Sequence, residues 1–301
     1  MQAHENLKTT LEYLPPAVRQ SLQRLKPDGI EEIRLRCARP VAVCIAGRER
    51  FLTESGMLTD TPEQALHMRT EDIAQSFQAV CAYSLYSHER DIASGFVTIR
   101  GGCRVGICGT ASNQPDMPMT LRHISGLNFR IAGEFIGCAS QIFRQIGTEP
   151  VSILLAGTVG SGKTTMLRDL CRLLGNRSRT SLVDERGEIA AVHRGIPQHD
   201  VGLKTDVLDG YPRAVGILTA LRVLTPEYIV CDELSTQEDV QAVLQAAGCG
   251  VQFAATCHAA TPDDLYRRPV LRPLLDAGMF RFCVMLGHAG TVQTIRRLAV
   301  R

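Results

Sequence analysis

Apolar residues in the second half of the chain form short runs that alternate with segments of helical periodicity. The short runs predict strands and lie at residues 151–156, 180–184, 228–232 and 251–256. The intervening segments repeat apolar side chains at helical spacing and predict helices at residues 164–174, 211–224 and 237–247. Strands that alternate with helices are typical of a parallel sheet covered by helices. Two more strands, around 288–290, are expected to finish the chain.

The first half of the chain has strand-like alternation but no regular succession of strands and helices. Residues 30–46 alternate apolar and polar side chains on both sides of a turn and predict a hairpin. The glycine pair Gly101 and Gly102 predicts the turn of a second hairpin, because both glycines accept backbone angles that other residues avoid. Residues 127–132 predict one more strand.

Helix-start signals add detail to this pattern. Residues 1–29 predict helical structure, and Thr70 is expected to cap a helix with an apolar face. Ser235 and Glu238 stand at the spacing of a capping box in front of the helix predicted at 237–247. A short helical piece is expected at 139–146.

The two patterns predict a two-domain α/β protein, and a length of 301 residues fits two domains. Residues 1–135 are expected to form a smaller α+β N-terminal domain. Residues 136–301 are expected to form a second domain with a predominantly parallel sheet.

The segment that begins at Gly157 reads GTVGSGKTT and matches the phosphate-binding pattern G-x-x-x-x-G-K-[ST]. It follows a predicted strand and precedes a predicted helix, which is the context that this loop requires. Its backbone N–H groups would surround phosphate at a helix N-terminus. Lys163 would reach the β- and γ-phosphates of ATP, and Thr164 would hold Mg²⁺. The expected nucleotide-binding residues are Gly157, Thr158, Val159, Gly160, Ser161, Gly162, Lys163, Thr164 and Thr165.

Acidic residues follow two of the predicted strands, where ligands of parallel sheets bind. Asp232 is expected to contact Mg²⁺ through its outer shell, and Glu233 to polarise the attacking water. The cluster at 184–188, DERGE, could be a solvated turn. Its place at a strand end instead favours a role for Glu188 in facing the γ-phosphate or its water. His258 ends the strand predicted at 251–256 and is expected to hydrogen-bond the γ-phosphate.

Composition and charge limit the kinds of binding partner, location and metal site that can be expected. A formal net charge of +2 gives no reason to expect nucleic-acid binding. No apolar run approaches the length of about 18 residues that a membrane-spanning helix needs, and the start of the chain lacks a signal-peptide core. A cytoplasmic location is therefore expected. The eleven cysteines are odd in number and form no C-x-x-C pair, so we expect small buried hydrophobic residues rather than disulfides or a zinc site.

The motifs GTVGSGKTT, VDERGEIAA, PEYIVCDEL and ATCHAATPDDL occur in the order phosphate loop, acidic box, Walker B and His box. In this order they resemble the secretion-superfamily ATPases of type II and type IV secretion and of pilus extension and retraction. The segments IEEIRLRCARPVAV and GFVTIRGGCRVGICG, together with the long run before the Walker B motif, are similar to the stage III sporulation protein AA family. This likeness extends from about residue 30 to about residue 298.

The resemblance implies that residues 136–301 form a P-loop NTPase domain of the RecA-like kind. It also implies an ATPase that forms a homo-oligomeric ring, expected to be a hexamer. It also implies that integral membrane proteins of a channel between mother cell and forespore are its partners. Carried onto this sequence, Lys163, Glu188, Glu233 and His258 act in hydrolysis. An arginine of the first domain would complete the site; Arg130 fits best and Arg104 is the alternative.

The sequence also departs from the larger secretion ATPases. An arginine usually follows soon after the Walker B glutamate, but here Leu234 and Ser235 follow. After the last predicted hairpin, we expect no counterpart of the long C-terminal helical region of those motors. These departures concern the mechanics of the larger motors and not nucleotide hydrolysis. Three other functions are weighed beside the motor: a phosphotransferase acting on a small acceptor, a nucleotide-gated scaffold with little turnover, and a DNA-dependent ATPase. The weak net charge and the lack of tryptophan count against the last.

Overall fold

The structure is a computed structural model, and it describes residues 2–25, 29–82, 89–93, 95–112, 120–147 and 149–298. The chain divides into two compact units. Unit 1 comprises the residues up to Glu134 together with His193–Gln198. Unit 2 comprises Phe135–Val192 and the residues from His199 onward.

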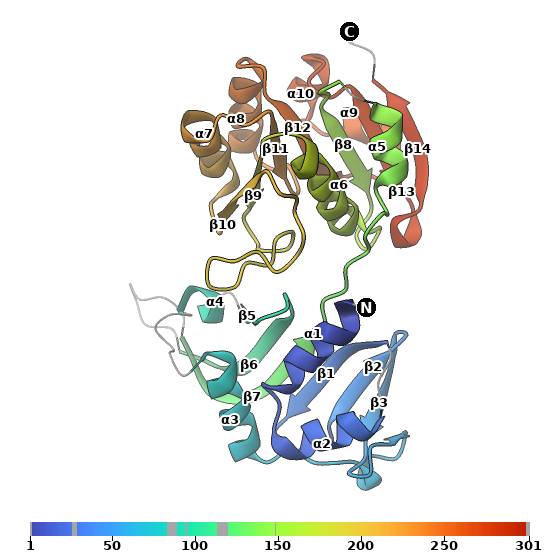
Figure 1. Cartoon of the computed structure of the whole chain (residues 1–301), viewed down its shortest axis with the longest axis vertical. Helices are drawn as coiled ribbons and strands as arrows, with labels where there is room; N and C mark the ends of the chain where they lie inside the picture. Colours follow the sequence, from blue (N-terminus) through green and yellow to red (C-terminus); the bar gives the residue numbers. More distant parts are fainter. Residues whose placement is uncertain are drawn as a thin grey trace. The chain divides into compact units, whose positions relative to one another are not determined.

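Unit 1 is built on an antiparallel sheet with the strand order β4-β3-β2-β1-β7-β6-β5 (Figure 1). Its strands are β1 (Ile30–Arg36), β2 (Ala42–Ile45), β3 (Arg48–Leu52), β4 (Leu58–Thr59), β5 (Phe96–Thr98), β6 (Arg104–Ser112) and β7 (Thr120–Arg130). Its helical segments are α1 (Gln2–Leu11), α2 (Pro16–Leu25), η1 (Pro62–Gln64), α3 (Thr70–Val80) and α4 (Glu89–Ala93).

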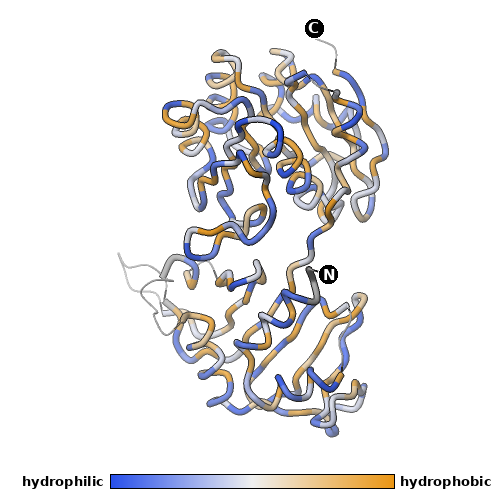
Figure 2. The backbone as a smooth tube through the Cα atoms, viewed as in Figure 1, coloured by the Kyte–Doolittle hydropathy of each residue, from blue (hydrophilic) through white to orange (hydrophobic). Residues whose placement is uncertain are grey.

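Alternation along β1 explains why this sheet has one apolar face. Ile33 and Leu35 are fully buried in the core of unit 1, whereas the side chains of Glu32 and Arg34 form an ion pair on the opposite face. Successive strand residues point to opposite sides of a sheet, so one face packs and the other carries charge. Figure 2 shows hydrophobic and hydrophilic positions interleaved along the chain.

Unit 2 is built on a sheet with the strand order β10-β9-β11-β12-β8-β13-β14 (Figure 1). Every pairing is parallel except that of β13 with β14. The strands are β8 (Ile153–Gly157), β9 (Thr180–Asp184), β10 (Thr205–Asp209), β11 (Tyr228–Cys231), β12 (Gln252–His258), β13 (Phe282–Leu286) and β14 (Val292–Arg297). The helical segments are α5 (Ser140–Ile146), α6 (Lys163–Arg177), α7 (Arg213–Val223), α8 (Gln237–Ala247), α9 (Pro262–Tyr266), α10 (Arg272–Asp276) and η3 (His288–Gly290).

Helices cover both faces of this sheet, which is why its central strands are mostly apolar. In β8, Leu154 and Ala156 belong to a core with residues of α7 and α8. Ile153 and Leu155 belong to a second core with residues of α5 and α6. The expected fold class, a RecA-like P-loop domain preceded by an α+β domain, is thereby confirmed.

The strand order brings the predicted motifs to one edge of the sheet. Strand β12 lies between β8, which leads into the phosphate loop, and β11, which leads into the Walker B acids. The carboxyl ends of parallel strands meet at the same edge, where ligands of such sheets bind. His258 ends β12 and pairs in register with Gly157.

Two predicted helix caps are wrong by one residue. Helix α3 has Arg69 at its N-cap, with its backbone N–H donating to Asp72, and Thr70 is the first helical residue. Helix α8 is capped by Thr236, whose hydroxyl accepts the N–H of Asp239 at 3.1 Å, and not by Ser235. In both cases an aspartate at the third helical position completes the cap. A search for a glutamate three residues after the cap does not find this arrangement.

The helical structure predicted within residues 1–29 is present as two helices, α1 and α2. Several other elements were not expected from the sequence. Strands β3, β4 and β10 have few buried side chains, so apolar runs do not reveal them. Among the described residues, no helix is long and apolar enough to cross a lipid bilayer.

Candidate functional site

The phosphate loop connects the end of β8 to the start of α6. Gly160 and Gly162 have φ angles of 76° and 82°, in the region that favours glycine. A Cβ on Gly162 would lie 3.0 Å from the backbone nitrogen of Gly290, so a larger residue would crowd the loop. The Lys163 ammonium donates to the carbonyl oxygens of Gly157 at 3.1 Å and Thr158 at 2.7 Å. The loop therefore curls around a positive charge.

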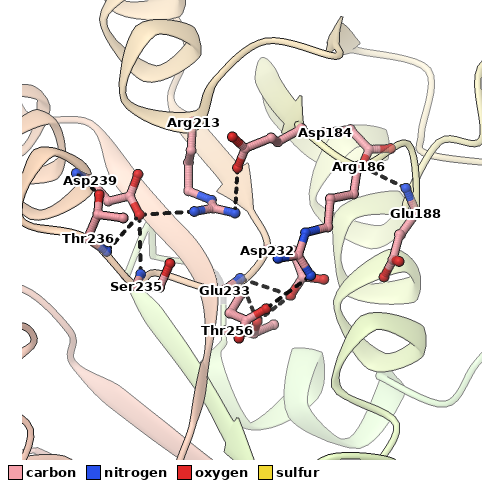
Figure 3. Close-up of polar contacts among 11 residues, drawn as sticks. Asp184, Arg186, Glu188, Arg213, Asp232, Glu233, Ser235, Thr236, Asp239 and Thr256 are labelled. Carbon is pink, nitrogen blue, oxygen red and sulfur yellow. Dashed lines mark hydrogen bonds and ion pairs between the residues drawn. The ribbon is translucent and has the colours of Figure 1, made fainter. Parts of the chain in front are cut away.

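Asp232 follows β11 directly, and Figure 3 shows it beside Glu233 and Thr256. Its Oδ2 accepts a hydrogen bond from Thr164 Oγ1 at 3.1 Å. Its Oδ1 accepts from the backbone N–H of Glu233 at 3.0 Å and from Thr256 Oγ1. The two residues predicted to bind Mg²⁺, Thr164 and Asp232, are thus in direct contact.

Glu233 has an unusual backbone for a residue with a long side chain. Its φ angle is +44°, in the left-handed region, where strain is commonly found at functional sites. Its backbone N–H donates to Thr256 Oγ1 at 2.8 Å as well as to Asp232. Its half-exposed carboxylate lies 3.5 Å from Arg186 Nη1.

The acidic box is organised by Asp184, whose side chain is buried. Its carboxylate accepts backbone N–H groups from Glu188 at 2.9 Å, Ile189 at 3.0 Å and Ala190 at 2.8 Å. Arg168 donates to the carbonyl oxygen of Glu188 at 2.6 Å. The box is therefore a hydrogen-bonded turn in which the backbone N–H and the carbonyl group of Glu188 both have partners.

Arg213 is a buried cation of this region that sequence reasoning missed (Figure 3). Its guanidinium contacts Asp239 at 2.9 Å and Glu185 at 2.9 Å. Burial disfavours the charged guanidinium, but the carboxylates of Asp239 and Glu185 raise the pKa of Arg213 above its usual value. No sequence pattern pairs these residues, since Asp239 is 26 positions away.

These side chains surround one pocket of about 370 Å³. Its lining includes Val159, Gly160, Lys163, Thr164, Val183, Asp184, Glu185, Arg186, Glu188, Arg213, Asp232, Glu233 and His258. The predicted acids, lysine, threonine and histidine are therefore brought together. The ring of His258 lies with Nδ1 3.1 Å from Arg268 Nη2.

The side chains of the pocket could supply only some of the ligands of a metal ion. Among the described residues, no three His, Cys, Asp or Glu side chains gather as a metal-binding group. Mg²⁺ commonly takes one or two protein ligands and completes its shell with water and substrate phosphates. Thr164 and Asp232 fit that pattern.

The two arginine candidates of the first domain belong to unit 1, and neither lines this pocket. They face each other across the β6–β7 pair. Arg130 lies 3.5 Å from Glu32, and the Arg104 guanidinium stands 4.5 Å from the centre of the Phe96 ring. Their expected contact with a neighbouring subunit stays a prediction.

Comparison with known proteins shows which family this chain resembles. The model of the family described as sporulation stage III, protein AA, matches residues 4–299. Stage III sporulation protein AA of Bacillus subtilis (strain 168) is 34% identical over 297 residues, which cover 94% of this chain and 93% of that protein.

Two solved structures resemble the chain in fold. The ATPase DotB of Legionella pneumophila has a TM-score of 0.55 at 16% identity, covering 89% of this chain and 74% of DotB. The pilus retraction motor PilT with bound ADP has a TM-score of 0.57 at 15% identity, covering 92% of this chain and 80% of PilT. At these identities the likeness shows the fold alone.

Proposed function

We propose that this chain, which belongs to the sporulation stage III protein AA family, is an ATPase that hydrolyses ATP in the pocket described above. One observation carries the proposal. A phosphate loop, a Thr164–Asp232 hydrogen bond and two further carboxylates, Glu188 and Glu233, line a single pocket. The likeness of the fold to DotB, called an ATPase, and to PilT with bound ADP supports it.

The loop fits a nucleotide phosphate. The hydroxyl of Ser161 is buried in the loop and has no hydrogen-bond partner among the described residues. The Lys163 ammonium donates to two neutral backbone carbonyl oxygens. We expect charged phosphate oxygens to replace them, because hydrogen bonds between charged groups are stronger. A buried hydroxyl without a partner is unfavourable, and we expect a phosphate oxygen to supply that partner.

Each residue of the pocket then has a role in the proposal. Lys163 neutralises charge on the β- and γ-phosphates, and Thr164 and Asp232 would hold Mg²⁺ between them. When bound, the metal ion neutralises further phosphate charge. Glu233 accepts a hydrogen bond from the attacking water and orients it, and Glu188 supports this from the acidic box. His258 lies at the end of the neighbouring strand and is proposed to contact the γ-phosphate.

The wider context is also a proposal. The chain would act as a homo-oligomeric ring, expected to be a hexamer, on the cytoplasmic side of a membrane. It would supply energy to a channel complex of integral membrane proteins during sporulation. The family membership supports this reading, and DotB and PilT show that the same fold serves an ATPase and a pilus motor.

A nucleotide-gated scaffold with little turnover is the second candidate, and one observation favours it. Arg186 lies 3.5 Å from the Glu233 carboxylate, so the proposed water-orienting group already has a partner. An arginine held in that place would compete with the attacking water for the carboxylate oxygens. If this pairing persists with ATP bound, turnover would be slow.

Phosphate release from ATP tests the proposal, with no other acceptor present. Wild type should release phosphate continuously, and Lys163→Ala should lose nearly all of this activity while staying folded. Lys204→Ala is the matched control, since Lys204 bonds the Arg177 carbonyl away from the pocket. Tight ATP binding without phosphate release would favour the scaffold. Equal release by wild type and Lys163→Ala would reject the site.

A further inference from the structure

Thr256 is a polar residue inside the apolar strand β12, and its side chain is fully buried. The strand lies between β8 and β11, so Thr256 stands between the strand before the phosphate loop and the strand before the Walker B acids. Burial of a hydroxyl is unfavourable unless it is hydrogen-bonded. Its partners therefore indicate what it is for.

The Thr256 hydroxyl both accepts and donates (Figure 3). It accepts the backbone N–H of Glu233 at 2.8 Å and donates to Asp232 Oδ1. The carbonyl oxygen of Thr256 also accepts the N–H of Leu234 at 2.9 Å. One residue of β12 thus binds three successive residues that follow β11.

These contacts continue to the phosphate loop. Asp232 uses its other oxygen, Oδ2, to accept from Thr164 Oγ1 at 3.1 Å. A line of hydrogen bonds therefore runs from Thr256 through Asp232 to Thr164. With a second partner on Oδ1, the carboxylate of Asp232 cannot rotate freely away from Thr164.

The same hydroxyl supports the backbone of Glu233. A φ of +44° is costly for a residue with a side chain, and it persists only where the surroundings hold it. The Glu233 N–H is held by Asp232 Oδ1 and Thr256 Oγ1 together. This backbone turn decides where the Glu233 carboxylate points.

We propose that Thr256 is a positioning residue for ATP hydrolysis. Its hydroxyl aligns Asp232 toward Thr164 and fixes the turn that directs Glu233. The inference rests on the proposed ATPase function. It adds a residue that does not line the pocket and acts through two residues that do.

Paired substitutions separate this role from simple core packing. Thr256→Val keeps the shape of the side chain and removes the hydroxyl, whereas Thr256→Ser keeps the hydroxyl and removes a methyl group. If the hydroxyl positions the acids, valine is the more harmful change. If Thr256 only fills the core, serine is the more harmful change, because it leaves a cavity.

The experiment measures kcat, KM and the Mg²⁺ concentration for half-maximal binding of a fluorescent, non-hydrolysable ATP analogue. Loss of a residue that orients a ligand group commonly costs about 10–100-fold in activity or metal affinity. Thr256→Val should lower kcat by about that factor, with KM little changed, and raise the Mg²⁺ requirement. Thr256→Ser should stay within a few-fold of wild type. Thr180→Val is the control, because its buried hydroxyl on β9 bonds the Ser178 carbonyl instead.

The two failures are distinguishable. If wild type releases no more phosphate than Lys163→Ala, the ATPase proposal fails; the Mg²⁺ requirement for analogue binding then decides the role of Thr256. If wild type is active and Thr256→Val matches it in kcat and Mg²⁺ requirement, the positioning role is overturned. A serine variant more impaired than the valine variant also overturns it.

Discussion

At the scale of single residues, the site depends on carboxylates with different duties. Asp184 is buried, and both of its carboxylate oxygens accept hydrogen bonds from backbone N–H groups, so it shapes a turn. Asp232 bonds two hydroxyls and a backbone N–H. Glu233 is half-exposed, and its carboxylate contacts the exposed side chain of Arg186. A carboxylate with spare acceptor capacity is the one suited to bind water.

We therefore expect Glu233→Gln to bind ATP but to turn it over about 10²–10⁴-fold more slowly, because a glutamine is a poor proton acceptor. Glu188→Gln should show a smaller loss. Equilibrium binding of ATP and steady-state phosphate release measure the two properties separately. The exposed Glu149→Gln serves as a control that leaves both unchanged. Loss of ATP binding in Glu233→Gln would assign that residue to ligand binding or folding instead.

At the scale of secondary-structure elements, Arg213 ties three segments together. It begins α7, contacts Asp239 in the first turn of α8, and contacts Glu185 in the acidic box. Asp239 also accepts the N–H groups of Ser235 and Thr236, which precede α8. This buried network sets the spacing between the acidic box and the segment after β11.

Removal of Arg213 should therefore destabilise unit 2. Arg213→Met leaves buried Asp239 and the nearby Glu185 without their cation, and loss of one partner of a buried ion pair typically costs about 3–5 kcal/mol. Thermal and denaturant unfolding would measure the change. Arg222→Met, on the exposed side of the same helix, should cost far less. Equal stability of the two variants would show that the network adds nothing to the fold.

The sequence predicts elements well where burial is complete. The strand at 180–184 and the helix at 237–247 have the same bounds in β9 and α8. Strand β10 was missed because it is an edge strand whose side chains are mostly not buried. Thr256 and Arg213 were missed because their partners lie more than 20 positions away, so only the folded chain pairs them.

For the whole molecule, the question is how many positive charges can reach the bound phosphates. Lys163 of the phosphate loop lines the pocket. Arg186 and Arg213 also line it, but both form ion pairs with carboxylates. A ring would add one more charge from a neighbouring subunit. Arg130 is largely exposed on β7, where its partner is the Glu32 side chain. An exposed arginine can change partners at low cost, and an arginine supplied in trans can raise phosphoryl-transfer rates strongly.

Mixed assemblies test this sharing. Arg130→Ala and Lys163→Ala should each lose activity, and mixing them should restore part of it, because an intact phosphate loop then meets an intact arginine. Specific activity of the wild type should also rise with protein concentration. Lys163→Ala mixed with Glu233→Gln is the control that restores nothing, since both defects lie in the same half of the site. Rescue with Arg104→Ala but not with Arg130→Ala would assign the role to Arg104. No rescue with either, and activity independent of concentration, would contradict a shared site.

We propose that the pocket between the phosphate loop and the Walker B acids activates water against the γ-phosphate of ATP. The most direct measurement follows phosphate released from ATP in water enriched in oxygen-18, with no other acceptor present. We expect the wild type to release phosphate steadily, and this phosphate should carry an oxygen atom from the solvent. The release should be lost in Lys163→Ala and strongly slowed in Glu233→Gln. Phosphate release that is absent in the wild type, or that is unchanged in both variants, would contradict it.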